Sequence, residues 1–233
     1  MTVAVTGGTG LVGRHFVRAA RAVGQGVVIL SRRPPPPGTL AAGVDWQPFD
    51  LAAPRLPAGV TTLVHCALAH EPGRYRGGEG GEPERFVRLN RDGSIALFAA
   101  ARAAGVARAV FLSSRAVYDG LPPGAALDEG AALAPDTLYG RVKAQVERAL
   151  DALTAPGFQT LSLRATGVYG PGPDHKWAGL FAEFAAGRPI APRAGTEVHG
   201  DDLARAADLA LAAGVTGPLN VTDLVVDRHD LLA

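Results

Sequence analysis

The sequence predicts an α/β fold with a doubly wound parallel sheet and a small C-terminal lobe. Apolar runs lie near 2–6, 27–31, 61–66, 108–113 and 158–164, and helical patterns alternate with them near 10–23, 84–104 and 138–153. This alternation is typical of βαβ units, whose parallel strands are covered by helices on both faces. Ligands of such sheets bind beyond the carboxyl ends of the strands, so the residues that follow each apolar run are the first candidates for a site.

The first apolar run leads into the segment AVTGGTGLVGR, residues 4–14, which has four glycines within seven positions. Glycine permits positive φ and close backbone approach but is costly inside a helix, so we expect a tight turn or a bound group here. The turn opens a helix, whose N-terminal N–H groups and dipole favour an anion such as a dinucleotide pyrophosphate. Gly7, Gly10 and Gly13 depart from the standard Gly-x-Gly-x-x-Gly spacing. A glycine-rich turn without a ligand is the alternative.

The second apolar run ends in Ser31, Arg32 and Arg33, with no carboxylate among them. At this position an acidic residue binds the ribose 2′-hydroxyl of NAD, whereas a nearby arginine accommodates the 2′-phosphate of NADP. Arginine binds phosphate through a bidentate fork, and a hydroxyl adds a further polar contact. The sequence therefore favours NADP(H) over NAD(H), with a solvated basic turn as the alternative.

In the segment LYGRVKAQVE, Tyr139 and Lys143 lie four residues apart in a predicted helix and so project from one face. An ammonium near a phenol favours the phenolate and lowers its pKa from about 10 towards neutrality. Such a tyrosine could exchange a proton with a carbonyl or alcohol oxygen. Lys143 also stands four residues before Glu147, so a surface ion pair is the alternative.

The apolar run near 108–113 ends in Ser113 and Ser114, which could hydrogen-bond a substrate oxygen or simply cap the loop. His65, Cys66 and His70 resemble a metal cluster, but no second pair of ligands follows them, so we expect no metal site.

Composition excludes several classes of protein. The chain has 233 residues, of which 47% are hydrophobic and 19% charged, and its net charge of +1 favours neither nucleic acid nor an acidic membrane surface as partner. No apolar run approaches the roughly 18 residues of a membrane span, and the first strand leaves no room for a signal peptide. A single cysteine suits the cytoplasm, and abundant Ala, Gly, Pro and Arg suggest a bacterial source.

Two segments carry little apolar content to bury: RRPPPPG at 32–38 and EPGRYRGGEGGEP at 71–83. We favour an insertion over a lid for the second segment. After residue 165 the pattern becomes irregular, with a short helix near 176–187 and a last helix that opens at HGDDLA, where Asp201 or Asp202 is the expected N-cap and His199 belongs to the helix start.

Several motifs occur together: TGGTGLVG, FDL, VHCALA, LNRDGS, FLSSRAVY, YGRVK, LRATGVYGPG and HGDDLA. With these motifs the chain resembles the extended short-chain dehydrogenase/reductase superfamily, in particular its NAD(P)-dependent epimerase/dehydratase branch. The resemblance implies a Rossmann-type fold, with a dinucleotide-binding domain at 1–165. It implies a small substrate lobe at 166–233, some elements of which return to the core, and a possible homodimer formed through the helices that hold Asn90 and Tyr139.

The resemblance also implies roles for individual residues. Tyr139 is the expected acid/base, Lys143 binds the nicotinamide ribose and Ser114 polarises the substrate oxygen. The expected cofactor-binding residues are Gly7, Thr9, Gly10, Leu11, Val12, Gly13, Ser31, Arg32, Arg33, Asp50, Leu51, Ala67 and Lys143. The expected substrate-binding residues are Asn90, Gly167 and Arg193.

Departures from the family pattern narrow the expected reaction. Arg115 and Ala116 stand where sugar-nucleotide dehydratases carry an Asp-Glu pair, and Gly167 replaces an asparagine that contacts the nucleotide phosphate. We therefore expect an NADPH-dependent reductase of a small ketone, aldehyde or ketosugar. An NAD-dependent nucleotide-sugar epimerase and a non-catalytic NADP-binding regulatory protein are the alternatives.

Overall fold

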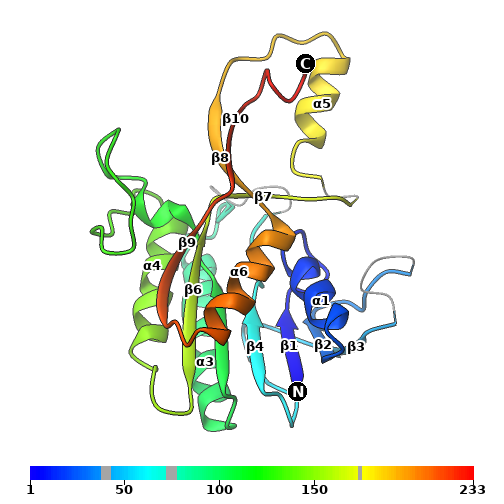
Figure 1. Ribbon diagram of the computed structural model, residues 1–233, viewed down its shortest axis with the longest axis vertical. Coiled ribbons are helices and arrows are strands. Elements are labelled where there is room, and N and C mark those ends of the chain that lie inside the picture. Colours follow the sequence, from blue (N-terminus) through cyan, green and yellow to red (C-terminus); the bar gives the residue numbers. More distant parts are fainter. Residues whose placement is uncertain (38–42, 72–77, 173–174) are drawn as a thin grey trace.

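The computed structural model describes residues 1–37, 43–71, 78–172 and 175–233 (Figure 1). In this part of the chain the main sheet has seven strands in the order β3-β2-β1-β4-β5-β6-β9, and its neighbours are parallel. The strands are β1 (Thr2–Thr6), β2 (Gly26–Ser31), β3 (Asp45–Pro48), β4 (Thr62–His65), β5 (Arg108–Leu112), β6 (Gln159–Ala165) and β9 (Gly217–Val221). The chain winds outward from β1 in both directions, so the order reverses between β1 and β4, where ligands of such sheets bind.

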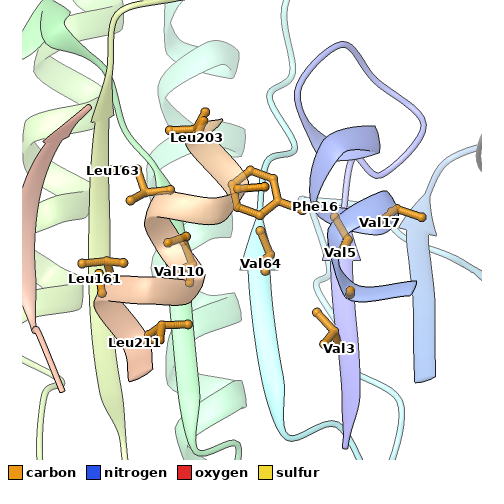
Figure 2. Packing of buried hydrophobic residues seen from close by; sticks show 14 of the residues in the cluster. Val3, Val5, Phe16, Val17, Val64, Val110, Leu161, Leu163, Leu203 and Leu211 are labelled. Carbon is orange, nitrogen blue, oxygen red and sulfur yellow. The ribbon is translucent and has the colours of Figure 1, made fainter. Parts of the chain in front are cut away.

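Helices cover both faces of the sheet. One face carries α1 (Gly13–Ala22) and α6 (Gly200–Ala212), which pack against each other. Figure 2 shows Phe16 of α1 and Leu203 of α6 above the strand residues Val5, Val64 and Leu163. The other face carries α3 (Gly93–Ala103) and α4 (Leu138–Asp151), whose apolar side chains share a second core cluster.

Strand register brings the site loops to one edge of the sheet. Val5 of β1 lies opposite Ile29 of β2 and Val64 of β4, so these three strands end at nearly the same level. The strands are almost wholly buried because helices lie above and below them, which explains their continuous apolar runs.

A small lobe lies beyond the carboxyl ends of the strands (Figure 1). It contains a sheet in the order β10-β8-β7, made of β10 (Leu224–Asp227), β8 (Ala194–His199) and β7 (Gly167–Tyr169), together with helix α5 (Ala178–Ala185). Between these strands the chain returns to the core as α6 and β9. None of the residues in α5 is buried. Among the described residues, no helix has the length and apolar character needed to cross a bilayer.

The predicted fold class is confirmed, and most predicted elements lie within a few residues of their observed bounds. The helix expected over 84–104 is divided into α2 (Pro83–Val87), a π-helical turn η1 (Arg88–Asp92) and α3. The sequence pattern did not predict β3, a short edge strand that is largely exposed and ends in proline. Nor did it predict β9 at the other edge of the main sheet or the short strands of the lobe. Residues 38 and 72–77, which belong to the segments 32–38 and 71–83 with little apolar content, lie outside the described residues.

Candidate active site

A cleft of about 1820 Å³ lies between the loops that follow the strands and the lobe. Pockets for a single small molecule are typically about 300–1,000 Å³, so this cleft has room for a dinucleotide together with a substrate. Every residue predicted from the sequence to bind cofactor or to act in catalysis lines it: Gly7, Thr9, Gly10, Leu11, Val12, Gly13, Ser31, Arg32, Arg33, Asp50, Leu51, Ala67, Ser114, Tyr139 and Lys143. Gly167 and Arg193, two of the predicted substrate-binding residues, line it as well.

The glycine loop between β1 and α1 fits a pyrophosphate. Gly7 has a φ of +64° and donates its N–H to the Leu30 carbonyl at 2.8 Å, which turns the chain at the strand end. A Cβ on Gly13 would lie closer than 3.0 Å to backbone atoms of Gly7 and Gly8. The first turn of α1 contains no acidic residue, so the positive end of its dipole meets the cleft unopposed.

A short basic turn follows β2. Ser31 donates its hydroxyl to the Arg33 carbonyl at 2.6 Å, and the Trp46 indole N–H donates to the Ser31 hydroxyl oxygen at 3.0 Å. The Ser31 hydroxyl thus holds the turn in shape. Arg32 and Arg33 are exposed, and neither guanidinium has an ion pair with any described residue. Trp46 has no motif of its own, which is why the sequence did not reveal its part in this turn.

Two residues of the motif FDL lie farther along the same edge. Asp50 is exposed and accepts the Ala52 backbone N–H at 2.9 Å, whereas the Leu51 side chain is buried in the core. Both residues line the cleft, where the cofactor is expected to bind.

A buried polar chain fixes the loop after β4. The Thr6 hydroxyl oxygen accepts the backbone N–H groups of Cys66 and Ala67 at 3.2 and 3.1 Å and lies 2.6 Å from His65 Nδ1. With both N–H groups directed at the oxygen, the hydroxyl hydrogen is free to donate to Nδ1, and His65 Nε2–H then donates to the Ser94 hydroxyl at 2.8 Å. Burial and the charge of Lys143 lower the pKa of His65 to about 3, so the imidazole is neutral at physiological pH.

Asn90 does not line the cleft, in contrast to the expected contact with substrate. The residue is buried in η1, and its side-chain amide exchanges two hydrogen bonds with the Ala69 backbone, at 2.7 and 2.8 Å. A third bond joins the amide NH₂ to the Phe86 carbonyl at 2.9 Å. These partners occupy the amide, so in this structure Asn90 positions the loop that follows β4.

Tyr139 and Lys143 project from the first turns of α4 into the cleft. The Lys143 ammonium is buried, donates to the Leu112 carbonyl at 2.6 Å, and lies 4.6 Å from the Phe111 ring centre and 5.6 Å from that of Tyr139. Burial lowers the pKa of Lys143 to about 8, although Cys66 and Glu147 act in the opposite direction. Lys143 is thus largely protonated at neutral pH and places a positive charge beside the phenol.

The two serines after β5 have different environments. Ser114 is the N-cap of the 3-10 turn η2 (Arg115–Tyr118), and its hydroxyl oxygen accepts the Ala116 N–H at 3.2 Å. That bond uses an acceptor position and leaves the hydroxyl hydrogen available to a ligand in the cleft. Ser113 is buried and donates to the Glu147 carboxylate.

The expected alternative of a surface pair between Lys143 and Glu147 is wrong, because both residues are buried and Glu147 pairs with Arg164 of β6. Arg164 Nη2 and Nε donate to Glu147 Oε2 at 2.8 and 3.0 Å. Burial alone would lower the pKa of Arg164, but the hydrogen bonds and charge of Glu147 raise it. Arg164 also donates to the Tyr118 hydroxyl, so the pair links β6, α4 and η2 beneath the cleft.

On the lobe side, an ion pair between Lys176 and Glu197 lies against Gly167. A Cβ on Gly167 would lie closer than 3.0 Å to the Lys176 ammonium and to the Glu197 carboxylate. The space of a side chain at position 167 is therefore filled by this pair.

The expectation that Asp201 or Asp202 caps α6 is wrong: His199 is the N-cap, because its ring accepts the Asp201 N–H. Asp201 instead pairs with His15 and Arg18 of α1.

Comparison with known proteins connects this geometry to a family. The model of the NAD dependent epimerase/dehydratase family matches residues 3–222. The ceramide reductase of Caulobacter vibrioides (strain NA1000 / CB15N) is 33% identical over 195 residues, which is 82% of this chain and 53% of that protein. The 3-diazoavenalumate denitrifying reductase of Streptomyces sp is 33% identical over 242 residues, which is 96% of this chain and 76% of that protein. The chain thus spans about half the length of the first relative.

Solved structures agree with this assignment. The Thermus thermophilus UDP-glucose 4-epimerase in complex with NAD superimposes with a TM-score of 0.80 at 28% identity, and the match covers 100% of this chain and 81% of that one. The shared architecture is a nicotinamide dinucleotide-binding fold with its cleft at the carboxyl ends of the strands.

Proposed function

This chain belongs to the NAD dependent epimerase/dehydratase family, and we propose that it is an NADPH-dependent reductase that acts on the carbonyl group of a small ketone, aldehyde or ketosugar. The observation that carries the proposal is the basic turn after β2. Arg32 and Arg33 line the cleft and lack ion-pair partners among the described residues, and the sequence places no carboxylate with them directly after β2. Two guanidinium groups with no ion pair to a described residue favour a 2′-phosphate, and NADPH is the form that reductive enzymes consume.

The residues of the cleft fit the cofactor. The loop from Gly7 to Gly13 would hold the pyrophosphate, Arg32 and Arg33 the 2′-phosphate, and Asp50 and Leu51 would lie by the adenine. When bound, the dinucleotide supplies the hydride. Ala67 is held in place by the Thr6 hydroxyl, which gives this wall of the cleft a fixed shape.

We assign the proton to Tyr139. Its phenol would deliver a proton to the substrate oxygen, and the Lys143 ammonium, 5.6 Å from the ring centre, stabilises the negative charge that remains on the phenol. Ser114 would donate its free hydroxyl hydrogen to the same oxygen and hold it in position. The carbonyl of Leu112 keeps Lys143 in place.

Epimerisation of a nucleotide sugar is the second candidate, because the Thermus thermophilus enzyme of the same fold is a UDP-glucose 4-epimerase with NAD. Its reaction would return the hydride to the substrate and consume no cofactor. The filled space at Gly167 counts against it, since no side chain at 167 can contact a nucleotide phosphate. A regulatory protein without catalytic activity has no need of catalytic side chains. The presence of Ser114, Tyr139 and Lys143 in the cleft therefore counts against this role.

Location and assembly form part of the proposal. We infer a bacterial cytoplasmic enzyme from the composition and the single cysteine. We also infer a homodimer through α3 and α4, which lie side by side on one face of the sheet. Size-exclusion chromatography with light scattering tests the dimer, and a monomer at micromolar concentration would contradict it.

The proposal is tested by following NADPH oxidation with a panel of ketones, aldehydes and ketosugars, using the parent protein and Tyr139→Phe. We expect net oxidation by the parent and a loss of about 100-fold or more in the variant, because it lacks the proton donor. Unimpaired turnover in Tyr139→Phe would exclude this role. Interconversion of UDP-glucose and UDP-galactose without NADPH consumption would favour the epimerase.

A further inference from the structure

Two arginines of the lobe face each other across a β-ribbon. Strands β8 and β10 are antiparallel, with Asp227 opposite Ala194, and Arg228 donates its backbone N–H to the Arg193 carbonyl at 3.3 Å. Arg193 and Arg228 are therefore opposite one another at the end of the ribbon, and both line the cleft. Like charges at directly opposite positions are destabilising, and neither guanidinium has an ion pair with a described residue. An anion between them would relieve the repulsion.

The same part of the cleft has an apolar wall. Apolar side chains from β7, from α5 and the residue before it, and from β10 and the turn after it line the cavity: Val168, Trp177, Leu180, Val225, Val226 and Leu231. Val226 lies two residues before Arg228 and therefore on the same face of the ribbon as the arginine pair. A ligand that covered this wall would remove apolar surface from water at about 25 cal/mol per Å².

The other charged groups of the lobe that line the cleft leave the arginine pair in excess. Lys176 and Glu197 neutralise each other, and their side chains are only 28% and 10% exposed. Among the described residues of the lobe, Glu183 is the remaining acidic residue that lines the cleft. Two cations thus face one carboxylate, beside a wall that suits an apolar body.

We propose that the substrate is a carbonyl compound with an aromatic or acyl body and a carboxylate, with the carboxylate held between Arg193 and Arg228. This inference rests on the proposed reductase function and names its substrate class. Arginine binds carboxylate in a bidentate fork, and the apolar wall covers the body of the molecule while its carbonyl lies by Tyr139. A nucleotide sugar suits this part of the cleft less well, because its sugar and base are polar and the space at Gly167 is filled.

The test compares para-formylbenzoate and para-formylcinnamate with their methyl esters as substrates for NADPH oxidation. The esters keep the carbonyl and the apolar body but lose the negative charge. We expect kcat/KM to favour a carboxylate over its ester by about tenfold or more, which corresponds to about 1.4 kcal/mol. Arg193→Gln and Arg228→Gln should each reduce this ratio towards one. Arg188→Gln is the matched control, since Arg188 is an exposed lobe arginine outside the cleft lining and should keep the ratio.

Calorimetry separates failure of this inference from failure of the proposed function. Titration of NADP⁺-loaded protein with para-formylbenzoate reports binding without turnover. Binding that depends on Arg193 and Arg228 supports the anion site even if no reduction follows, in which case the reductase proposal fails alone. Reduction of acid and ester at equal rates overturns the anion site and leaves the reductase standing. Tighter, arginine-dependent binding of UDP-glucose than of either carboxylate would also overturn it, in favour of a diphosphate.

Discussion

Replacement of Glu147 by Gln should lower the free energy of unfolding by more than the replacement of an exposed residue does. Glu147 accepts bonds from Ser113 and from two nitrogens of Arg164, and the Arg164 and Glu147 side chains are 5% and 6% exposed. Loss of one charge from a buried pair leaves its partner uncompensated, which costs about 3–5 kcal/mol. We therefore expect Glu147→Gln to lower the free energy of unfolding by about 3 kcal/mol or more.

Urea denaturation followed by circular dichroism measures this cost, and a double-mutant cycle isolates the pair. Glu147→Met alone and Arg164→Met alone should each be similarly destabilising, because each leaves one buried charge without its partner. Glu147→Met with Arg164→Met should be much milder than the sum of the single changes, since both charges leave together. Glu84→Gln, an exposed carboxylate on α2, is the control and should stay within about 0.5 kcal/mol. A cost below about 1 kcal/mol for Glu147→Gln, with single changes that add in the double variant, would show that the buried pair does not stabilise the fold.

Three further outcomes follow from the site geometry. Gly13→Ala should abolish cofactor binding or folding, because the added Cβ would clash with the Gly7 backbone. Gly10→Ala, whose added Cβ has its nearest contact at 3.3 Å, should have a milder effect. Equal effects of the two variants in calorimetry and thermal melts would contradict this prediction. Lys143, with its pKa at about 8, should lose its charge above that pH, so kcat/KM should fall as the pH rises past 8. Lys143→Arg should remove this fall, because arginine stays charged. The same fall in the variant would show that another group causes it. Burial lowers the pKa values of His15 and His65 from 6.5 to about 4 and about 3. Below pH 6.5 the unfolded chain therefore binds more protons than the folded protein. Each histidine should then lower the free energy of unfolding by up to ~1.4 kcal/mol per pH unit as the pH falls. Urea midpoints that did not change between about pH 7 and about pH 5 would contradict the burial of both rings.

The sequence was informative where one residue type satisfies one local requirement. Gly7 adopts a positive φ, and position 13 has no room for a Cβ. The glycine pattern therefore predicted both the tight turn and a dinucleotide as the bound group. The four-residue spacing of Tyr139 and Lys143 likewise placed both side chains on one face of their helix, and in the structure that face lines the cleft.

The sequence was uninformative where a residue depends on a distant partner. Glu147 reads as the surface partner of Lys143 until β6 brings Arg164 beneath α4, seventeen positions away in the sequence. Asn90 reads as a ligand of the substrate, yet the loop after β4 supplies backbone groups that occupy its amide. Arg228 carried no motif, and only the antiparallel register of β10 with β8 sets it opposite Arg193.

Calorimetric titration of purified, cofactor-free protein with NADPH and with NADH tests the preference for NADPH. If Arg32 and Arg33 bind the 2′-phosphate, NADPH should bind about tenfold tighter or more, a difference of about 1.4 kcal/mol, and the joint change Arg32→Gln with Arg33→Gln should remove that difference. Arg102→Gln, an exposed arginine of α3, should leave it intact. Equal or tighter binding of NADH, or NAD retained through purification, would contradict an NADPH-dependent reductase and favour the epimerase.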